Sequence, residues 1–462
     1  MTANAKSLEL ETKPVGKLLI QYAMPAIVAM TASSLYNMVD SIFIGRGVGA
    51  MAISGLALTF PLMNLMGAFG SMVGVGASTL MSVKLGQKDY KTATKILGNV
   101  VVLNIIIGIA LTIIVIPFLD DILRFFGGSD QTIPYAHEYM FVILLGNFVT
   151  HLYLGLNALL RSIGRPRQAM NATIFTVVIN TILDPIFIYG FGWGIAGAAI
   201  ATILAQVLSL MYQFYIFSQP TEIVRLHKGI YKLQFSLVRD SLVMGLSPFL
   251  MNFAACFVVI LINQGLSFYG NQDLGGNGGD ILIGAYGIAN RLVFFIVMVI
   301  IGVNQGMQPI AGYNYGAKLH DRVIGVTKYA IMAATTISTT GFLIAQLFAE
   351  SIVGIFTTDA ELIRLSAQGL RLMVLIFPLV GFQMVTGNFF QSIGKPARAI
   401  ILSLARQVLV LIPCLIIMPK FFGYMGVWYS MPTSDLIATV LSTIFIIQHI
   451  KKLKREADCP RE

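Results

Sequence analysis

Long apolar segments recur along the whole 462-residue chain and limit what it can fold into. A helix needs about 20 mainly apolar residues to cross the hydrocarbon core of a bilayer. Segments of that length lie near residues 17–44, 50–83, 93–117, 134–160, 167–189, 195–218, 240–269, 281–313, 324–348, 363–392, 397–418 and 426–449. The sequence therefore predicts an all-α integral membrane protein with twelve transmembrane helices.

The composition excludes several classes of protein. Charged residues make up 11% of the chain, less than half of the roughly 25% typical of soluble domains, which excludes a soluble enzyme. The net charge of +10 does not indicate nucleic-acid binding, because the basic residues are spread between apolar segments. The three cysteines, Cys256, Cys414 and Cys459, have neither disulfide nor metal-site spacing. Phosphate-loop and nucleophile motifs are absent, so we expect neither an enzyme nor a bound cofactor.

The distribution of Lys and Arg sets the expected orientation, because cytoplasmic loops of membrane proteins are enriched in both. If the N-terminus is cytoplasmic, most basic residues fall on the cytoplasmic side. The four that fall outside are Arg46, Arg124, Arg364 and Lys420. The first sixteen residues mix acidic and basic side chains and lack a small-residue cleavage site after a short apolar core, which is not the pattern of a signal peptide. We therefore expect a multi-pass protein of the bacterial cytoplasmic membrane with both termini inside.

An internal repeat relates the two halves. The sequence Ser-Ile-Gly-Arg-Pro at 162–166 recurs 230 residues later as Ser-Ile-Gly-Lys-Pro at 392–396, and the same offset relates Gly76 to Gly306. Six helices per repeat predict two six-helix bundles related by a pseudo-two-fold axis along the membrane normal. The expected parts are a cytoplasmic tail at 1–16, an N-terminal bundle at 17–217, a cytoplasmic linker and hinge at 218–239, a C-terminal bundle at 240–449 and a basic cytoplasmic tail at 450–462.

Two carboxylates in the N-terminal half lie within predicted membrane helices, where a charged side chain is costly in free energy. Each costs about 2.5–3.5 kcal/mol at bilayer depth unless it is paired, neutralised or hydrated. At a rise of 1.5 Å per residue, Asp40 and Asp184 lie about 6–9 Å below the outer ends of their helices. Asn180, Thr202 and Tyr36 are expected close to that level. Hard oxygen ligands in a poorly hydrated place predict a proton or cation site; the alternative is a hydrogen-bond cluster that joins helices.

Two further sets of residues are expected to shape the bundles. Arg406 and Asp435 both lie near the middle of predicted adjacent helices, where they can form a buried ion pair; we favour this structural role over a second coupling site. Pro25 and Pro248 occupy corresponding places in the first helix of each bundle. Proline removes a backbone donor, so both positions predict helix kinks.

These features resemble the multidrug and toxin extrusion (MATE) family over roughly residues 15–450. The likeness is to its bacterial MepA-like members, in or near the DinF-type branch. It rests on the segments 36–40 and 180–185, on Gly86, on the two repeated turns and on the segment 432–435. Some members form a sodium site in the C-terminal half with acidic residues of the seventh and tenth helices. The corresponding segments here, 240–269 and 363–392, lack those acids, so that site is not expected.

The resemblance implies a secondary transporter that exports amphipathic, often cationic drugs while H⁺ or Na⁺ enters. It implies an ion site of Asp40, Asn180, Asp184 and Thr202, with further contributions from Tyr36, Tyr139 and Asn157. No metal other than Na⁺ is expected, and the partners are the lipid bilayer and small drugs, with no nucleic acid; we expect a monomer. The alternative is a flippase for lipid-linked oligosaccharides, which the small number of arginines within the spans disfavours; they are Arg291, Arg371 and Arg406.

Overall fold

The computed structural model describes residues 9–275 and 278–458, and this part of the chain is helical with short connections. The first group of helices, which we call the N-lobe, comprises α2 (Val15–Gly47), α3 (Ala50–Gly86), α4 (Tyr90–Val115), α5 (Leu119–Phe125), α6 (Ile133–Leu145), α7 (Asn147–Ser162), α8 (Pro166–Pro185) and α9 (Gly194–Ser218). The second group, the C-lobe, comprises α10 (Phe235–Leu274), α11 (Gly278–Gly316), α12 (His320–Val353), α13 (Ala360–Met373), α14 (Phe377–Ser392), α15 (Pro396–Leu404), α16 (Ile412–Phe422) and α17 (Tyr424–Asp458). Short 3₁₀ or π segments, η1 (Ile116–Phe118), η2 (Ile186–Gly190) and η3 (Ala405–Leu411), join some of them.

The number of membrane spans agrees with the sequence prediction. In the described residues, ten helices or continuous helix runs are long and apolar enough to cross a membrane, and two bent pairs raise the number to twelve. The bends, 57° between α6 and α7 and 52° between α13 and α14, were not predicted, because each pair is one unbroken apolar run in the sequence. Pro378 lies in the first turn of α14, where a helix makes no use of the backbone N–H that proline lacks.

Several boundaries also differ from the prediction by two residues or more. Helix α2 begins at Val15 and α10 begins at Phe235, five residues before the expected 240. Helix α17 continues to Asp458, so most of the predicted basic tail is helical. Basic side chains in a last helical turn interact favourably with the helix dipole, which accounts for the extension. Cys459 lies outside the described residues.

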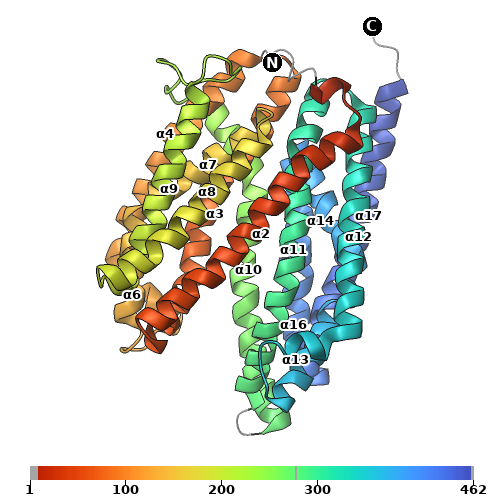
Figure 1. Ribbon diagram of the computed structural model, residues 1–462. Helices are drawn as coiled ribbons and strands as arrows, with labels where there is room; N and C mark the ends of the chain where they lie inside the picture. The colour runs from red at the N-terminus through yellow and green to blue at the C-terminus, as the bar shows by residue number, and fades with distance from the viewer. Residues whose placement is uncertain (1–8, 276–277, 459–462) are drawn as a thin grey trace.

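The two lobes lie side by side, and α2 begins and α17 ends at the same end of the molecule, which we call the inner end (Figure 1). Helix α2 packs against α11, and α10 packs against α3. A Cβ atom added at Gly76 would lie 1.9 Å from the Ser241 carbonyl oxygen, and one at Gly306 would lie 2.5 Å from the Ala23 backbone nitrogen. The 230-residue repeat thus relates two equivalent places where the lobes touch backbone to backbone.

Toward the opposite, outer end the lobes separate. On α3 nearly every residue from Val73 to Ser82 is buried, whereas Phe60 and Asn64 are exposed. On α11 the burial that holds from Gly302 inward gives way to half-exposed phenylalanines further out. The ribbons of the two lobes diverge in the same direction (Figure 1). We call the space between the separated faces the outer gap.

The connection between the lobes, residues 219–234, is fastened to the N-lobe. Arg165, in the turn before α8, forms an ion pair with the buried carboxylate of Glu222. Near the end of the connection, the Gln234 N–H donates to Oδ1 of Asn99 on α4 at 2.9 Å. A connection held at both ends by one lobe moves with it, so any hinge lies where α10 begins.

The segment just before α2 is bound by the C-lobe. Arg322 on α12 donates from Nη2 to the carbonyl oxygens of Leu10 and Lys13 at 2.8 and 2.7 Å. Its Nε donates to Oδ1 of Asn314, which is fully buried on α11. The side chain of Leu10 is only 4% exposed. The described end of the predicted cytoplasmic tail, residues 9–14, is therefore bound to the C-lobe at the inner end, although it leads into the first helix of the N-lobe.

Replacing Arg322 with Ala is expected to free this segment, because two carbonyl groups lose a charged donor, and hydrogen bonds to charged groups contribute about 1.5–3 kcal/mol. Hydrogen–deuterium exchange at residues 9–13 should then become at least about tenfold faster. Lys328→Ala is the matched control, since Lys328 is an exposed cation on the same helix. Unchanged exchange in the Arg322 variant would show that other contacts hold the segment.

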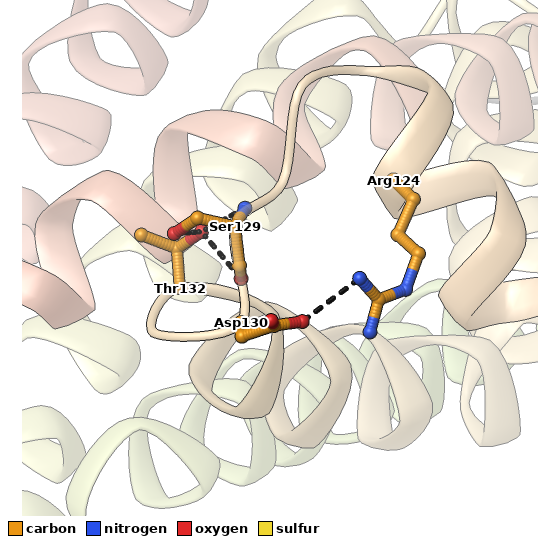
Figure 2. Close-up of polar contacts among 4 residues, drawn as sticks. All are labelled: Arg124, Ser129, Asp130 and Thr132. Atoms are coloured by element: carbon orange, nitrogen blue, oxygen red, sulfur yellow. Dashed lines mark hydrogen bonds and ion pairs between the residues drawn. The ribbon is translucent and has the colours of Figure 1, made fainter.

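The outer loop between α5 and α6 is ordered by short-range contacts (Figure 2). The Ser129 N–H donates to Oγ1 of Thr132 at 3.0 Å, and Arg124 Nη1 donates to Oδ1 of Asp130 at 2.9 Å. The side chains of Arg124 and Asp130 are 56% and 87% exposed. Exposed ion pairs contribute little to stability, so we expect substitutions of Arg124 and Asp130 to change the free energy of unfolding little.

Candidate functional site

A network of hydroxyl and amide groups joins α2, α8 and α9 in the outer half of the N-lobe. The Thr202 hydroxyl donates to the Ala198 carbonyl oxygen at 3.1 Å. Its own oxygen is therefore free to accept, and it receives Nδ2 of Asn180 at 3.2 Å. The Tyr36 hydroxyl lies 3.0 Å from the same oxygen. The structure thus brings together three of the residues that the sequence placed at one depth.

Asp40 and Asp184 lie beside this network, near enough to each other for their charges to interact. Their side chains are buried, at 5% and 0% exposure. Among the described residues, Oδ1 of Asp40, both carboxylate oxygens of Asp184 and Oδ1 of Asn180 have no hydrogen-bond donor. Buried acceptors without donors are costly, and ionised ones more so. Four such oxygens in one place form a site whose chemistry calls for a proton or a cation.

Tyr36 is one of the three residues given a weaker part in the predicted site, and the other two, Tyr139 and Asn157, differ in position. Tyr139 on α6 is 2% exposed, and its hydroxyl interacts electrostatically with Asp40 and Asp184. Asn157 on α7 is not in the cluster. Its Nδ2 donates to the Ala169 carbonyl at 2.9 Å, and its Oδ1 accepts from Arg161 at 2.5 Å. Asn157 therefore joins α7 to the inner half of α8.

The helices that carry the two carboxylates are connected to each other on the outer side of the site. Helix α8 ends at Pro185, directly after Asp184, and continues as the π segment η2. Short π segments often occur at functional sites. The Tyr189 hydroxyl of η2 donates to the Phe43 carbonyl oxygen of α2 at 2.9 Å. This contact, which the sequence did not predict, ties α8 to α2 one turn beyond Asp40.

Sequence reasoning also missed three buried polar side chains in the N-lobe. Nε2 of His151 donates to the Met66 carbonyl oxygen at 2.9 Å. Asn104 and Gln213 are fully buried, and their amide groups have no hydrogen-bond partner within the described part of the chain. The available signal was a polar residue inside an apolar segment, the same signal that singled out Asp40.

In the C-lobe, Arg406 and Asp435 form an ion pair, as the sequence suggested. Nε of Arg406 donates to Oδ1 of Asp435 at 2.6 Å. The Asp435 side chain is 5% exposed and that of Arg406 is 32% exposed. Arg406 lies on the π segment η3, which joins α15 to α16, and Asp435 lies on α17. The pair therefore links two neighbouring spans of one lobe.

Reversing one charge of this pair is expected to lower the free energy of unfolding by about 3 kcal/mol, because removal of a partner leaves a buried charge uncompensated. The double variant Arg406→Asp with Asp435→Arg should recover more than half of the lost melting temperature in detergent. The same two-way exchange of Arg124 and Asp130 is the control and should change little. Absence of recovery in the double variant would remove the pairing as a source of stability.

Comparison with known proteins decides the family. The MatE family model matches residues 25–186 and 249–416, one segment in each lobe. The chain belongs to the MatE family. It is 27% identical over 436 residues to the multidrug export protein MepA of Staphylococcus aureus (strain MSSA476), a match that covers 94% of each chain. It is 26% identical to the MepA of Staphylococcus haemolyticus (strain JCSC1435), over 96% of this chain and 95% of the other.

Solved structures agree with the fold of this MatE protein. A MATE protein in the bent conformation matches with a TM-score of 0.89 at 25% identity, over 98% of this chain and 99% of that one. The outward-facing form of a multidrug resistance MATE transporter of the MOP superfamily matches with a TM-score of 0.88 at 24% identity, over 97% and 98%, and shows the fold alone. The predicted family, the all-α membrane fold and the multi-pass architecture are confirmed. The proteins matched are transporters and export proteins.

Proposed function

We propose that this MatE protein exports amphipathic, often cationic drugs in exchange for H⁺ or Na⁺ entering the cell. The observation that carries the proposal is the set of buried oxygens without donors at Asp40, Asn180 and Asp184. Such a site releases free energy when a proton or cation arrives from outside. The similarity to proteins named multidrug export proteins supports drugs as the cargo.

The two candidate coupling ions would use the same atoms. A proton would sit on one of the two neighbouring carboxyl groups and remove the repulsion between them. A sodium ion would take the oxygens of Asp40, Asp184 and Asn180, since hard cations prefer oxygen ligands. The membrane potential supplies about 2.3 kcal/mol per charge per 100 mV, so either ion can drive outward movement of the cargo.

Helix α2 provides the mechanical connection in this proposal. It carries Asp40 in its outer half, while Ala23 and Ile27 of its inner half pack against glycines of α11. With both termini in the cytoplasm, the touching inner ends close the cytoplasmic side. Ion binding at Asp40 changes the position of α2, and α2 transmits the change to the contact between the lobes. The lobes then alternate between outer and inner opening.

Transport of a lipid-linked oligosaccharide is the alternative function. Its anionic headgroup calls for several arginines facing the space between the lobes. Arg406 is engaged by Asp435, and Arg371 contacts the carboxylate of Glu350 at 3.4 Å. Only Arg291 of the three is left for the outer gap, so the drug-export proposal is favoured.

Purified protein in proteoliposomes tests the proposal. Ethidium is loaded into the vesicle compartment that corresponds to the cytoplasm, and an inward H⁺ or Na⁺ gradient is imposed separately. We expect ethidium export with one of the two gradients and none in vesicles without protein. Ethidium export without either gradient would contradict coupling to H⁺ or Na⁺. Absence of ethidium export with either gradient would contradict the proposal that the protein exports cationic drugs of this kind.

A further inference from the structure

Three apolar side chains are exposed together where the connection between the lobes leads into α10. Tyr231, Leu233 and Phe235 are 43%, 44% and 82% exposed. The other tight turns at the inner end expose no large apolar side chain; they are residues 86–90, 162–166, 316–320 and 392–396. The three side chains, which we call the apolar triplet, therefore distinguish this connection from the other inner turns.

The backbone behind the apolar triplet is fixed to α4 of the N-lobe. Asn99 accepts the Gln234 N–H, and its Nδ2 donates to the Lys232 carbonyl oxygen at 3.5 Å. A Cβ atom added at Gly98 would overlap the Ile230 carbonyl group. The connection lies over the inner end of the N-lobe (Figure 1). The triplet thus projects from a backbone that the lobe holds in place.

The apolar triplet lies at the depth of the lipid headgroups. On α10 a long uncharged run begins at Ser241, directly after Arg239 and Asp240. Phe235 precedes Ser241 by six residues, about 9 Å along the helix. The headgroup layer on each side of the hydrocarbon is about 5–8 Å thick, and a tilted helix covers less of the bilayer depth per residue. Phe235 and its neighbours therefore meet the headgroups and the acyl chains next to them.

Exposed cations flank the apolar triplet in the sequence. They are Arg225, Lys228, Lys232 and Arg239. Of the two carboxylates in the same stretch, Glu222 pairs with Arg165, and Asp240 lies 3.6 Å from Arg239. Within residues 9–275 and 278–458, the other three cations form no ion pair. Cations alone would only set the topology. Cations beside exposed apolar side chains fit a molecule with an anionic head and an apolar body.

We propose that this connection binds anionic phospholipids of the leaflet at the inner end. Arg225, Lys228 and Lys232 attract a headgroup that carries a net negative charge. The apolar triplet packs against the glycerol region and the first methylene groups of the acyl chains. A zwitterionic headgroup offers the same apolar contacts without the net charge, so it binds less well. Because the N-lobe holds the connection at both ends, a lipid bound there moves with the N-lobe, next to the start of α10.

Photocrosslinking measures which lipid lies against the triplet. Benzoylphenylalanine replaces Leu233, and the full-length protein is placed in nanodiscs of equimolar phosphatidylglycerol and phosphatidylcholine with the same acyl chains. Mass spectrometry of the crosslinked protein then counts the two lipids. We expect at least about threefold more phosphatidylglycerol. The same replacement at Ile113, which is 67% exposed in an uncharged part of α4, is the control and should capture both lipids equally.

The double variant Lys228→Gln with Lys232→Gln tests the cations. It should lower the preference for phosphatidylglycerol at position 233 at least about twofold. Lys88→Gln with Lys318→Gln removes two exposed cations from inner turns without an apolar triplet and should leave the preference unchanged. If the first double variant does not fold, about a tenfold higher salt concentration should lower the preference of the wild-type lysines in the same way, because salt screens exposed charges.

Three results would overturn the proposal. The first is equal capture of both lipids at position 233. The second is capture of neither lipid at position 233 while position 113 captures both, which would place the triplet in water. The third is a preference for phosphatidylglycerol that persists after loss of the two lysines, because the anionic headgroup would then be bound elsewhere.

Discussion

Replacement of Asp40 by Asn is expected to reduce gradient-driven dye export to the level of vesicles without protein. Asn keeps the size and one carbonyl oxygen of the side chain, but it can neither take up a proton nor carry the charge that attracts a cation. Asp184→Asn should have the same effect, because the two carboxylates act as one pair. The double variant should be no worse than either single variant, since residues that act as a unit are strongly non-additive.

The control is Asp121→Asn, which removes an exposed carboxylate at the outer end of the N-lobe. It should export at the wild-type rate. Gel filtration of each variant establishes that the protein is folded, and removal of an unpaired buried charge should leave its melting temperature equal or higher. Wild-type export by folded Asp40→Asn would show that coupling does not pass through this pair.

The spans were predictable because apolar length and the distribution of Lys and Arg are local properties of the chain. The bends were not. Residues 134–160 and 363–392 are each one apolar run, and only packing against the rest of the lobe shows that α6 and α7, like α13 and α14, meet at an angle. The contact of Arg322 with the segment before α2 was missed for a related reason. The acceptors that Arg322 binds are backbone carbonyls, which no side-chain pattern marks.

The candidate site was predictable to the extent that the rise per residue of a helix gives the depth of each side chain in the membrane. Asp40, Asn180, Asp184 and Thr202 lie on three helices, and depth alone placed them at one level. A hydrogen bond shows that Asn180 and Thr202 also meet, and the two buried carboxylates lie beside them. Asn157, which the resemblance added to the site, lies instead near the inner end of α7, bonded to α8. Depth does not tell which way a side chain points.

Replacement of Gly76 by Leu is expected to prevent closure of the inner end and to abolish export. The added Cβ would lie 1.9 Å from the Ser241 carbonyl oxygen and 2.7 Å from the Gly245 backbone nitrogen. Both are backbone atoms of α10, so no side chain can turn away and the lobes must separate. Overpacking costs typically about 1–3 kcal/mol. Since about 1.4 kcal/mol changes an equilibrium tenfold, the outward-open form loses its predominance.

The native thiol of Cys256 reports this change. Cys256 lies eleven residues outward from Gly245, about three turns along α10 and on the same face toward the N-lobe. The measurement uses a protein that carries Cys414→Ser and Cys459→Ser, so that Cys256 is the thiol labelled. An impermeant maleimide added from outside should label Cys256 at least about tenfold more slowly in Gly76→Leu, because opening the inner end closes the outer gap. Gly67→Leu is the control on the same helix, where an added Cβ meets no atom within 4 Å. Equal labelling rates in both variants would contradict a rigid closure through Gly76, since two lobes that rock as bodies cannot open at one end and stay open at the other.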